Sequence, residues 1–312
     1  MTKNCYNLRS IDMANCVSCT MEGDNLYSVL ETLVLRSHWN IPMKNYFDIN
    51  LCINLKHLDC DWTIVAISDL SSKLSKLNKL ILSSLTDFNI DDVIARNLTY
   101  LKINHSQKTF DFSKYTKVKV LILWQVKFIN IDKLTQLKHL CYELEEYDDK
   151  IFVDSCNHTN LTCLNLNNCL FSNLFRLTKL NVLILNNINY LHIEQIWNKD
   201  LMYMSKLTRL DLLSNDDIRH ENKIFDSNKL NHVINLKHFC CNFVLDDLSV
   251  LKSVNRLAFE YDSHRHVIGK LTKLRNILIM NNVSNVDCSE LHRLVFVDEK
   301  QINRHPKMKI MN

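Results

Sequence analysis

Residues that could perform chemistry are common in this chain of 312 residues, but their spacing rarely builds a site. Cys16 and Cys19 form a CxxC pair, yet no second pair follows at the spacing of a zinc site. The stretch His264–His266 (HRH) is expected to lie in a solvated turn. Serine, histidine and aspartate are plentiful, and no spacing selects a catalytic triad. The sequence therefore predicts no enzyme, no metal and no cofactor.

Two further classes of chemistry fit poorly. The chain has only two glycines, Gly23 and Gly269, and they are far apart, so no glycine-rich phosphate loop is present. The formal net charge is +4, with 38 basic and 34 acidic residues. A nucleic-acid binder would concentrate basic residues in a stripe, whereas acidic and basic residues here are dispersed. Nucleic-acid binding is the less favoured reading.

The residue types of this chain fit the binding of another protein better than they fit catalysis or nucleic-acid binding. Aromatic side chains with charged neighbours, such as Tyr100, Trp124 and His139, are the kinds that carry interface energy. The predicted partner-binding residues are His57, Asp59, Asp61, Trp62, Tyr100, Lys102, Ile122, Trp124, His139 and Glu143. The chain must then contain elements that bring these residues to one surface.

A leucine repeat supplies such elements. The template L-x-x-L-x-L, with other apolar residues sometimes replacing leucine, recurs about every 22 residues. Fourteen units begin at Leu8, Leu30, Leu55, Leu77, Leu98, Val118, Leu137, Leu161, Leu180, Leu207, Leu236, Val254, Leu274 and Leu291. The final spacing of two is the period of a strand, and the preceding spacings of three, as in 174–180, suit a 3₁₀-like turn. Stacked units can bury the leucines together, which one unit cannot.

The leads 177–180 and 271–274 (LTKL), 134–137 (LTQL) and 74–77 (LSKL) resemble those of leucine-rich repeats of the short, 22-residue internalin-like class. The scarcity of Gly and Pro is also similar to repeat proteins of large AT-rich DNA viruses, such as entomopoxviruses and mimivirus. The resemblance implies an α/β repeat solenoid: a curved horseshoe with a parallel concave sheet of about 14 strands. Its convex side would hold short 3₁₀ or irregular segments.

The chain departs from that family at two kinds of position. The ninth place is usually Asn or Cys, as at Cys169, but here Val126 and Glu145 also occupy it, so some turns must satisfy backbone groups in another way. Asn is abundant and is expected to take over turns that glycine usually makes. The long steps from Leu180 to Leu236 leave room for extra turns or short helices.

The third, fifth and seventh places of each unit are expected to face the concave side. They include the predicted partner-binding residues, with Trp62 next to them, and several large apolar groups, which predicts a groove centred on the third to seventh repeats. The apolar residues are Val34, Ile81, Ile122, Val182, Ile184, Leu278 and Val295. Charged residues follow downstream at Arg209, Asp211, His238, Arg256, Glu260 and Arg293.

The expected organisation is a short lead at 1–7, a solenoid at 8–298 and a polar tail at 299–312. With no capping repeat before residue 8, the first strand would present an open edge. We expect that edge to be covered by another chain or a second copy; a frayed first repeat is the alternative.

The leading functional reading is a non-enzymatic scaffold that binds a protein partner on its concave face. The alternative is a substrate-recognition subunit of a ubiquitin ligase without its own F-box, because the first repeat leaves no room for one upstream. No signal peptide or apolar run of membrane-spanning length is evident, and the 12 cysteines form no paired framework. A cytoplasmic or nuclear location is therefore expected, within a host cell if the protein is viral.

Overall fold

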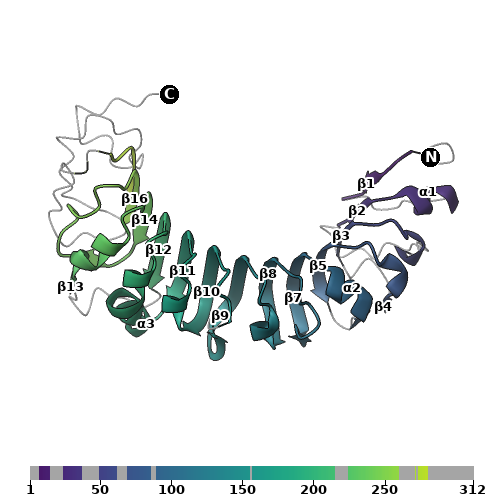
Figure 1. Ribbon diagram of the computed structural model, residues 1–312, viewed down its shortest axis with the longest axis horizontal. Helices are drawn as coiled ribbons and strands as arrows, with labels where there is room; N and C mark the ends of the chain where they lie inside the picture. Colours follow the sequence, from purple (N-terminus) through teal and green to yellow (C-terminus); the bar gives the residue numbers. More distant parts are fainter. Residues whose placement is uncertain are drawn as a thin grey trace. The chain divides into compact units, whose positions relative to one another are not determined.

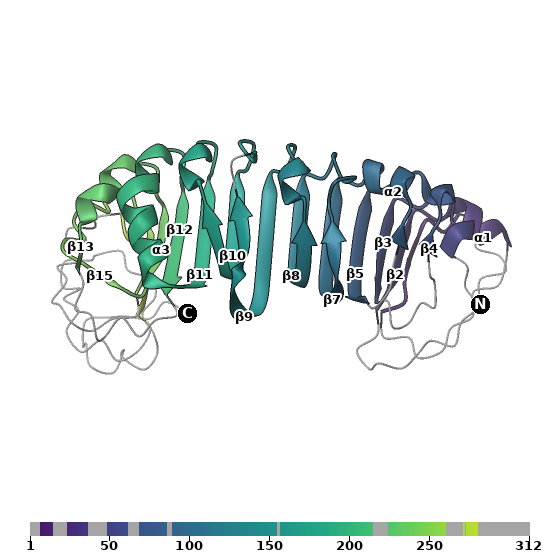
Figure 2. The ribbon, with the colours of Figure 1, turned by 90° about the horizontal axis from the view of Figure 1, so that it is seen from below.

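The computed structural model describes residues 7–14, 24–36, 49–61, 69–85, 89–154, 157–214, 224–259, 271 and 273–279. The chain forms two compact units, Met1–Glu145 and Glu146–Asn312. Each unit is built on parallel strands that lie side by side in chain order, one strand from each repeat (Figures 1 and 2). The fourteenth predicted repeat, the tail and the residues before position 7 lie outside the described residues.

In the first unit the main sheet runs through seven strands: β1 (Ser10–Asp12), β2 (Thr32–Leu35), β3 (His57–Asp61), β5 (Lys79–Leu85), β7 (Tyr100–Asp111), β8 (Val120–Ile129) and the start of β9 (His139–Asp154). A small sheet pairs β4 (Asp69–Leu70) with β6 (Asn89–Ile90). The connecting segments hold short helices: α1 (Asp24–Val29), η1 (Ile49–Leu51), η2 (Ser72–Leu74), α2 (Asp92–Asn97) and η3 (Ile131–Lys133). Figure 2 shows α1 and α2 set to one side of these strands.

The main sheet of the second unit contains β10 (Cys163–Ser172), β11 (Val182–Ile188), β12 (Arg209–Ser214), β14 (His238–Cys241), β16 (Arg256–Phe259) and β17 (Asn276–Ile279). A second pair joins β13 (Ile224–Phe225) to β15 (Val244–Leu245). The helical segments are η4 (Leu174–Arg176), α3 (Tyr190–Gln195), the π-helix η5 (Ile196–Asp200), η6 (Leu201–Tyr203) and η8 (Ser227–His232). The long steps therefore contain the short helices that the sequence predicts, and residues 174–176 form the predicted 3₁₀ turn.

The leucines of the template form the core. In β8, Leu121 and Leu123 are fully buried, as are Leu183 and Leu185 in β11. The first template residue of the second to thirteenth units is also buried, for example Leu180, whereas Leu8 in the first unit is half-buried. Burial of each such side chain contributes about 1.5–3 kcal/mol to stability. The inward direction of the periodic leucines is thus confirmed from the second repeat onward, wherever the side chain is described, while Leu8, Ile11 and Met13 of the first repeat are only half-buried.

Left-handed backbone recurs at two fixed places in the repeat, and asparagine fills most of them. At the eighth place φ is positive at His105 (52°), Gln125 (55°), Asn168 (60°) and Asn187 (53°). At the thirteenth place it is positive at Asn130 (60°) and Asn173 (59°). Because Asn tolerates this region better than other residues with a Cβ, the chain turns at these places without glycine.

Candidate functional site

The third, fifth and seventh places of the repeats in the first unit line up in three rows across the sheet. We call this surface the open face. Residues in each row are successive Cα partners in the parallel register. The first row is Ser10, Thr32, His57, Lys79, Tyr100, Val120 and His139; the second is Asp12, Val34, Asp59, Ile81, Lys102, Ile122 and Cys141; the third runs Asp61, Ser83, Asn104, Trp124 and Glu143. Nine of the ten predicted partner-binding residues therefore fall in these rows, and Trp62 lies outside the described residues.

Trp124 is the large apolar side chain of the open face that is most accessible, with 41% of its surface exposed. Its ring centroid lies 4.9 Å from that of His105. The His105 ring is in turn hydrogen-bonded through Nδ1 to the side-chain oxygen of Gln125. The indole is therefore supported from one side and accessible from the other.

Tyr100 and Lys79 form a second feature of the first row. Nζ of Lys79 lies 5.0 Å from the centroid of the Tyr100 ring, a cation–π distance. Burial raises the pKa of the Tyr100 hydroxyl, so it remains a neutral donor. Burial and the nearby Lys79 ammonium lower the pKa of His57. Nε2 of His57 is buried and has no hydrogen-bond partner in the described part of the chain, which leaves one polar atom of this row unused.

Asp59 is held by Arg36, a residue that the sequence did not single out. Nε of Arg36 donates to Oδ1 of Asp59 at 2.8 Å, and Nη2 donates to Oδ2. The Asp59 side chain is 5% exposed, whereas that of Arg36 is 55% exposed. The bond to Asp59 raises the pKa of Arg36. The group that this pair offers to a partner is therefore the guanidinium, and Arg36 stands at the seventh place of its repeat, where the same template would have found it.

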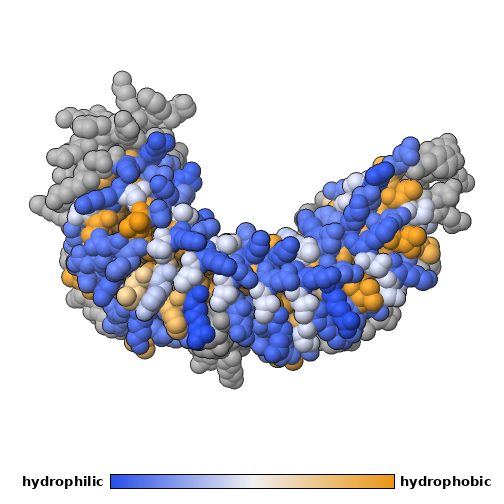
Figure 3. All heavy atoms as spheres, in the orientation of Figure 1, coloured by the Kyte–Doolittle hydropathy of each residue, from blue (hydrophilic) through white to orange (hydrophobic). Residues whose placement is uncertain are grey.

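Apolar residues on the open face are less accessible than the sequence suggested. Ile81 is 8% exposed, and Val34 and Ile122 are only half-buried. Figure 3 looks at the side of the molecule, not onto the open face, and there hydrophobic residues form small separate patches on a largely hydrophilic surface. The open face is thus a mixed surface with one prominent aromatic group, not a continuous apolar strip.

The sheet of the second unit presents a different set of residues at the same places. Arg209, His238, Arg256 and Asn276 are successive Cα partners, and Asp211, Cys240 and Ala258 form the adjacent row. Val182 and Ile184 are half-buried. Glu260, Arg293 and Val295 lie outside the described residues, as does the Leu278 side chain.

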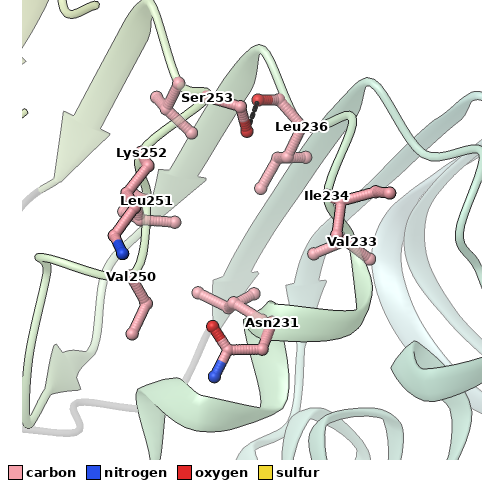
Figure 4. A pocket seen from close by; sticks show the side chains of 10 residues that line it. Asn231, Val233, Ile234, Leu236, Val250, Leu251, Lys252 and Ser253 are labelled. Carbon is pink, nitrogen blue, oxygen red and sulfur yellow. Dashed lines mark hydrogen bonds between the residues drawn. The ribbon is translucent and has the colours of Figure 1, made fainter. Parts of the chain in front are cut away.

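A hollow of about 200 Å³ lies in the second unit, between the segment that follows η8 and the turn before β16 (Figure 4). Its wall is mainly apolar, and Ser253 closes one side by donating to the Leu236 carbonyl at 2.8 Å. Lys252 is the one lining residue that carries a charge. The lining residues are Leu230, Asn231, Val233, Ile234, Leu236, Val250, Leu251, Lys252, Ser253 and Val254.

Four of the described cysteines, Cys52, Cys60, Cys169 and Cys241, are buried as small core residues. Cys60 and Cys241 are buried at leucine places of their strands, and burial raises the pKa of the Cys241 thiol, which disfavours the reactive thiolate. Across the described ranges, no three His, Cys, Asp or Glu side chains come together in a way that could hold a metal ion. Cys16, Cys19 and His264–His266 lie outside those ranges. Among the helices that the structure describes, none has the length and apolarity needed to cross a bilayer.

Comparison with known proteins gives a likeness of fold. No family model matches the sequence, and no curated protein matches it. An internalin, InlF from Listeria monocytogenes, superposes with a TM-score of 0.62 at 19% identity, over 93% of this chain and 86% of that one. The functional domain of InlJ from the same organism, which includes a cysteine ladder, superposes with a TM-score of 0.54 at 18% identity, over 88% of this chain and 68% of that one. With its repeat, its inward leucines and its parallel strands, the chain has the leucine-rich-repeat fold of the internalin-like kind.

Proposed function

We propose that the protein is a non-enzymatic scaffold whose open face binds a protein partner. The exposed Trp124, the most accessible large apolar side chain described on the open face, is the observation that carries this proposal. A tryptophan exposed by 41% leaves apolar area in water that a partner would cover. The leucine-rich-repeat fold, shared with the internalins, supports a role that works through surface recognition.

The residue types around Trp124 fit an interface centre. Trp, Tyr and Arg are the side chains that most often dominate binding energy. On the open face these are Trp124, Tyr100 and the outward guanidinium of Arg36. The seven strands of the unit span about 30 Å at a spacing of about 4.8 Å, which suits an interface of about 800 Å² on each partner.

The first experiment is affinity capture from a lysate of the source cell, followed by mass spectrometry and by measurement of the captured partner's affinity. The double variant Trp124→Ala/Tyr100→Ala is expected to bind the partner at least about tenfold more weakly, because two interface aromatics are removed. Phe175→Ala/Tyr203→Ala is the matched control. These two aromatic residues are also exposed and in contact, with ring centroids 5.9 Å apart, but they belong to η4 and η6.

An unchanged affinity for Trp124→Ala/Tyr100→Ala would remove the open face as the binding surface. Equal losses in both double variants would indicate a nonspecific effect of aromatic removal. Arg36→Gln adds a third measurement, since it removes the guanidinium but also leaves the buried Asp59 carboxylate without its partner. Its affinity should therefore be compared with that of Arg36→Gln/Asp59→Asn, which removes both charges.

A further inference from the structure

Basic residues gather at the amino ends of four neighbouring strands in the second unit. Arg209 begins β12, His238 begins β14 and Arg256 begins β16, and the three are successive Cα partners. Lys237 and Arg275 come one residue before β14 and β17 and are exposed. Arg209, His238 and Arg256 stand at the same outward place of neighbouring strands that are about 4.8 Å apart, so their side chains share a small area. We call these three residues the basic row.

The charge of the basic row is poorly balanced. Among the described residues at the outward places of this sheet, Asp211 is the only acid. Its Oδ2 accepts from Nε and Nη2 of Arg209 at 2.9 and 2.6 Å. Arg256 is exposed and has no hydrogen bond or ion pair within the described part of the chain. The guanidinium of Arg256 is therefore available to bind an anion, and that of Arg209 is only partly engaged by Asp211.

The pKa of His238 is affected by the charges around it. Its pKa is lowered, first by burial and then by the positive charges of Arg256 and Arg209, while Asp211 acts in the opposite direction. The imidazole of the free protein is therefore mainly neutral near pH 7. An anion placed between the two arginines would reverse this effect and favour protonation of His238.

We propose that the basic row is a docking site for an acidic segment of a protein partner, with one carboxylate on Arg256 and a neighbouring one beside His238. A guanidinium and a carboxylate can form two parallel hydrogen bonds, a geometry that selects carboxylates. Within the described residues Arg256 has no ion pair and Asp211 is the single acid at the outward places, which makes the site complementary to a run of Asp or Glu.

A protein segment fits this surface better than a nucleic acid does. Single-stranded nucleic acid is held by a long basic groove together with aromatic side chains on which bases stack. Within the described ranges, the outward places of β10, β11, β12, β14 and β16 carry no aromatic side chain other than the His238 imidazole. Phe239 in the middle of β14 is buried with 1% exposure. This proposal concerns the second unit only and does not depend on the open face of the first.

The test uses the full chain and a fluorescein-labelled hexaglutamate peptide, with binding followed by fluorescence anisotropy at low salt. Arg256→Gln is expected to weaken binding about tenfold, the effect of losing a charge-assisted pair. Arg176→Gln changes the net charge equally, but Arg176 lies on η4, away from the basic row, and this control should change the affinity less than about twofold. Arg256→Lys should fall between the wild type and Arg256→Gln, because it keeps the charge without the fork.

A pH series provides a second readout. The groups that face His238 are Arg209 and Asp211 from β12 and Arg256 from β16, with Lys237 and Cys240 on its own segment. His is the residue type among these whose ordinary pKa, about 6.5, lies in the range from about pH 7.5 to pH 6 in which the series is run. The affinity for hexaglutamate should therefore rise as the pH falls over this range, and His238→Gln should abolish the rise.

Several results would overturn the proposal. One is that hexaglutamate binds no more tightly than hexaglutamine. Another is that the wild type and Arg256→Gln bind hexaglutamate with equal affinity. An oligothymidylate of the same charge that binds more tightly than hexaglutamate, and loses its affinity in Arg256→Gln, would assign the basic row to nucleic acid instead. Circular dichroism of each variant shows whether the fold is retained.

Discussion

Tyr142 shows how one residue can replace a missing feature of the repeat. It occupies the last leucine place of its unit and is 1% exposed. Its hydroxyl donates to the carbonyl of Val126 at 3.2 Å. Val126 is a ninth-place residue that cannot satisfy backbone groups as Asn would. The hydroxyl of the neighbouring repeat therefore takes over part of that role, and the Tyr142 ring also packs edge-on against Phe128 at 5.0 Å.

We expect Tyr142→Phe to lower the free energy of unfolding by about 1 kcal/mol, because it removes a buried hydrogen bond while keeping the ring. Urea unfolding followed by circular dichroism measures this. Tyr203→Phe is the control, since Tyr203 is 49% exposed and its hydroxyl can bond to water. Equal stabilities of Tyr142→Phe and the wild type would show that the Val126 carbonyl finds another donor.

At the scale of elements, each repeat combines a strand with turns in left-handed backbone. Asn130 precedes η3 with a φ of 60°, and its Nδ2 donates to Oδ1 of Asp111 at 2.8 Å. That bond and the one from the Ser113 amide lower the pKa of Asp111. The abundance of Asn indicated that such turns exist, but their places could be assigned only once φ was known at each residue.

Two substitutions at one residue separate the backbone effect from the side-chain effect. Asn130→Gly and Asn130→Ala both remove the amide, but only alanine has a Cβ that disfavours a φ of 60°. We expect Asn130→Ala to be less stable than Asn130→Gly by about 1 kcal/mol in urea unfolding. If Asn130→Ala were as stable as Asn130→Gly, the backbone at residue 130 would have to leave the left-handed region in the alanine variant.

At the scale of the molecule, stability in a solenoid is a sum of repeats and of contacts between neighbours. Leu183 in β11 is fully buried, while Ile184 beside it points outward and is half-buried. Within the second unit, β11 pairs directly with β10 and β12 but not with β16. A substitution that destabilises β11 should therefore destabilise mainly β10 and β12.

We expect Leu183→Ala to cost about 2–5 kcal/mol of local stability. Hydrogen exchange monitored by mass spectrometry should show the largest loss of protection in β10, β11 and β12, and a smaller one in β16. Ile184→Ala, the control on the outward place, should change protection much less. A uniform loss across all strands of the second unit would mean that the unit opens as a single cooperative body.

The sequence by itself determined the repeat, the inward leucines and the three outward places of each strand. Leucine spacing reports strand and turn periods locally, and repetition makes that signal strong. It was sufficient to place His57, Tyr100 and Trp124 on one face. Only the tertiary structure decided which outward groups are available, because accessibility depends on neighbours in adjacent strands that are about 20 residues away in sequence. Thus Arg36 forms an ion pair with Asp59, neighbouring side chains bury Ile81, and Arg256 has no ion pair with any acid in the described residues.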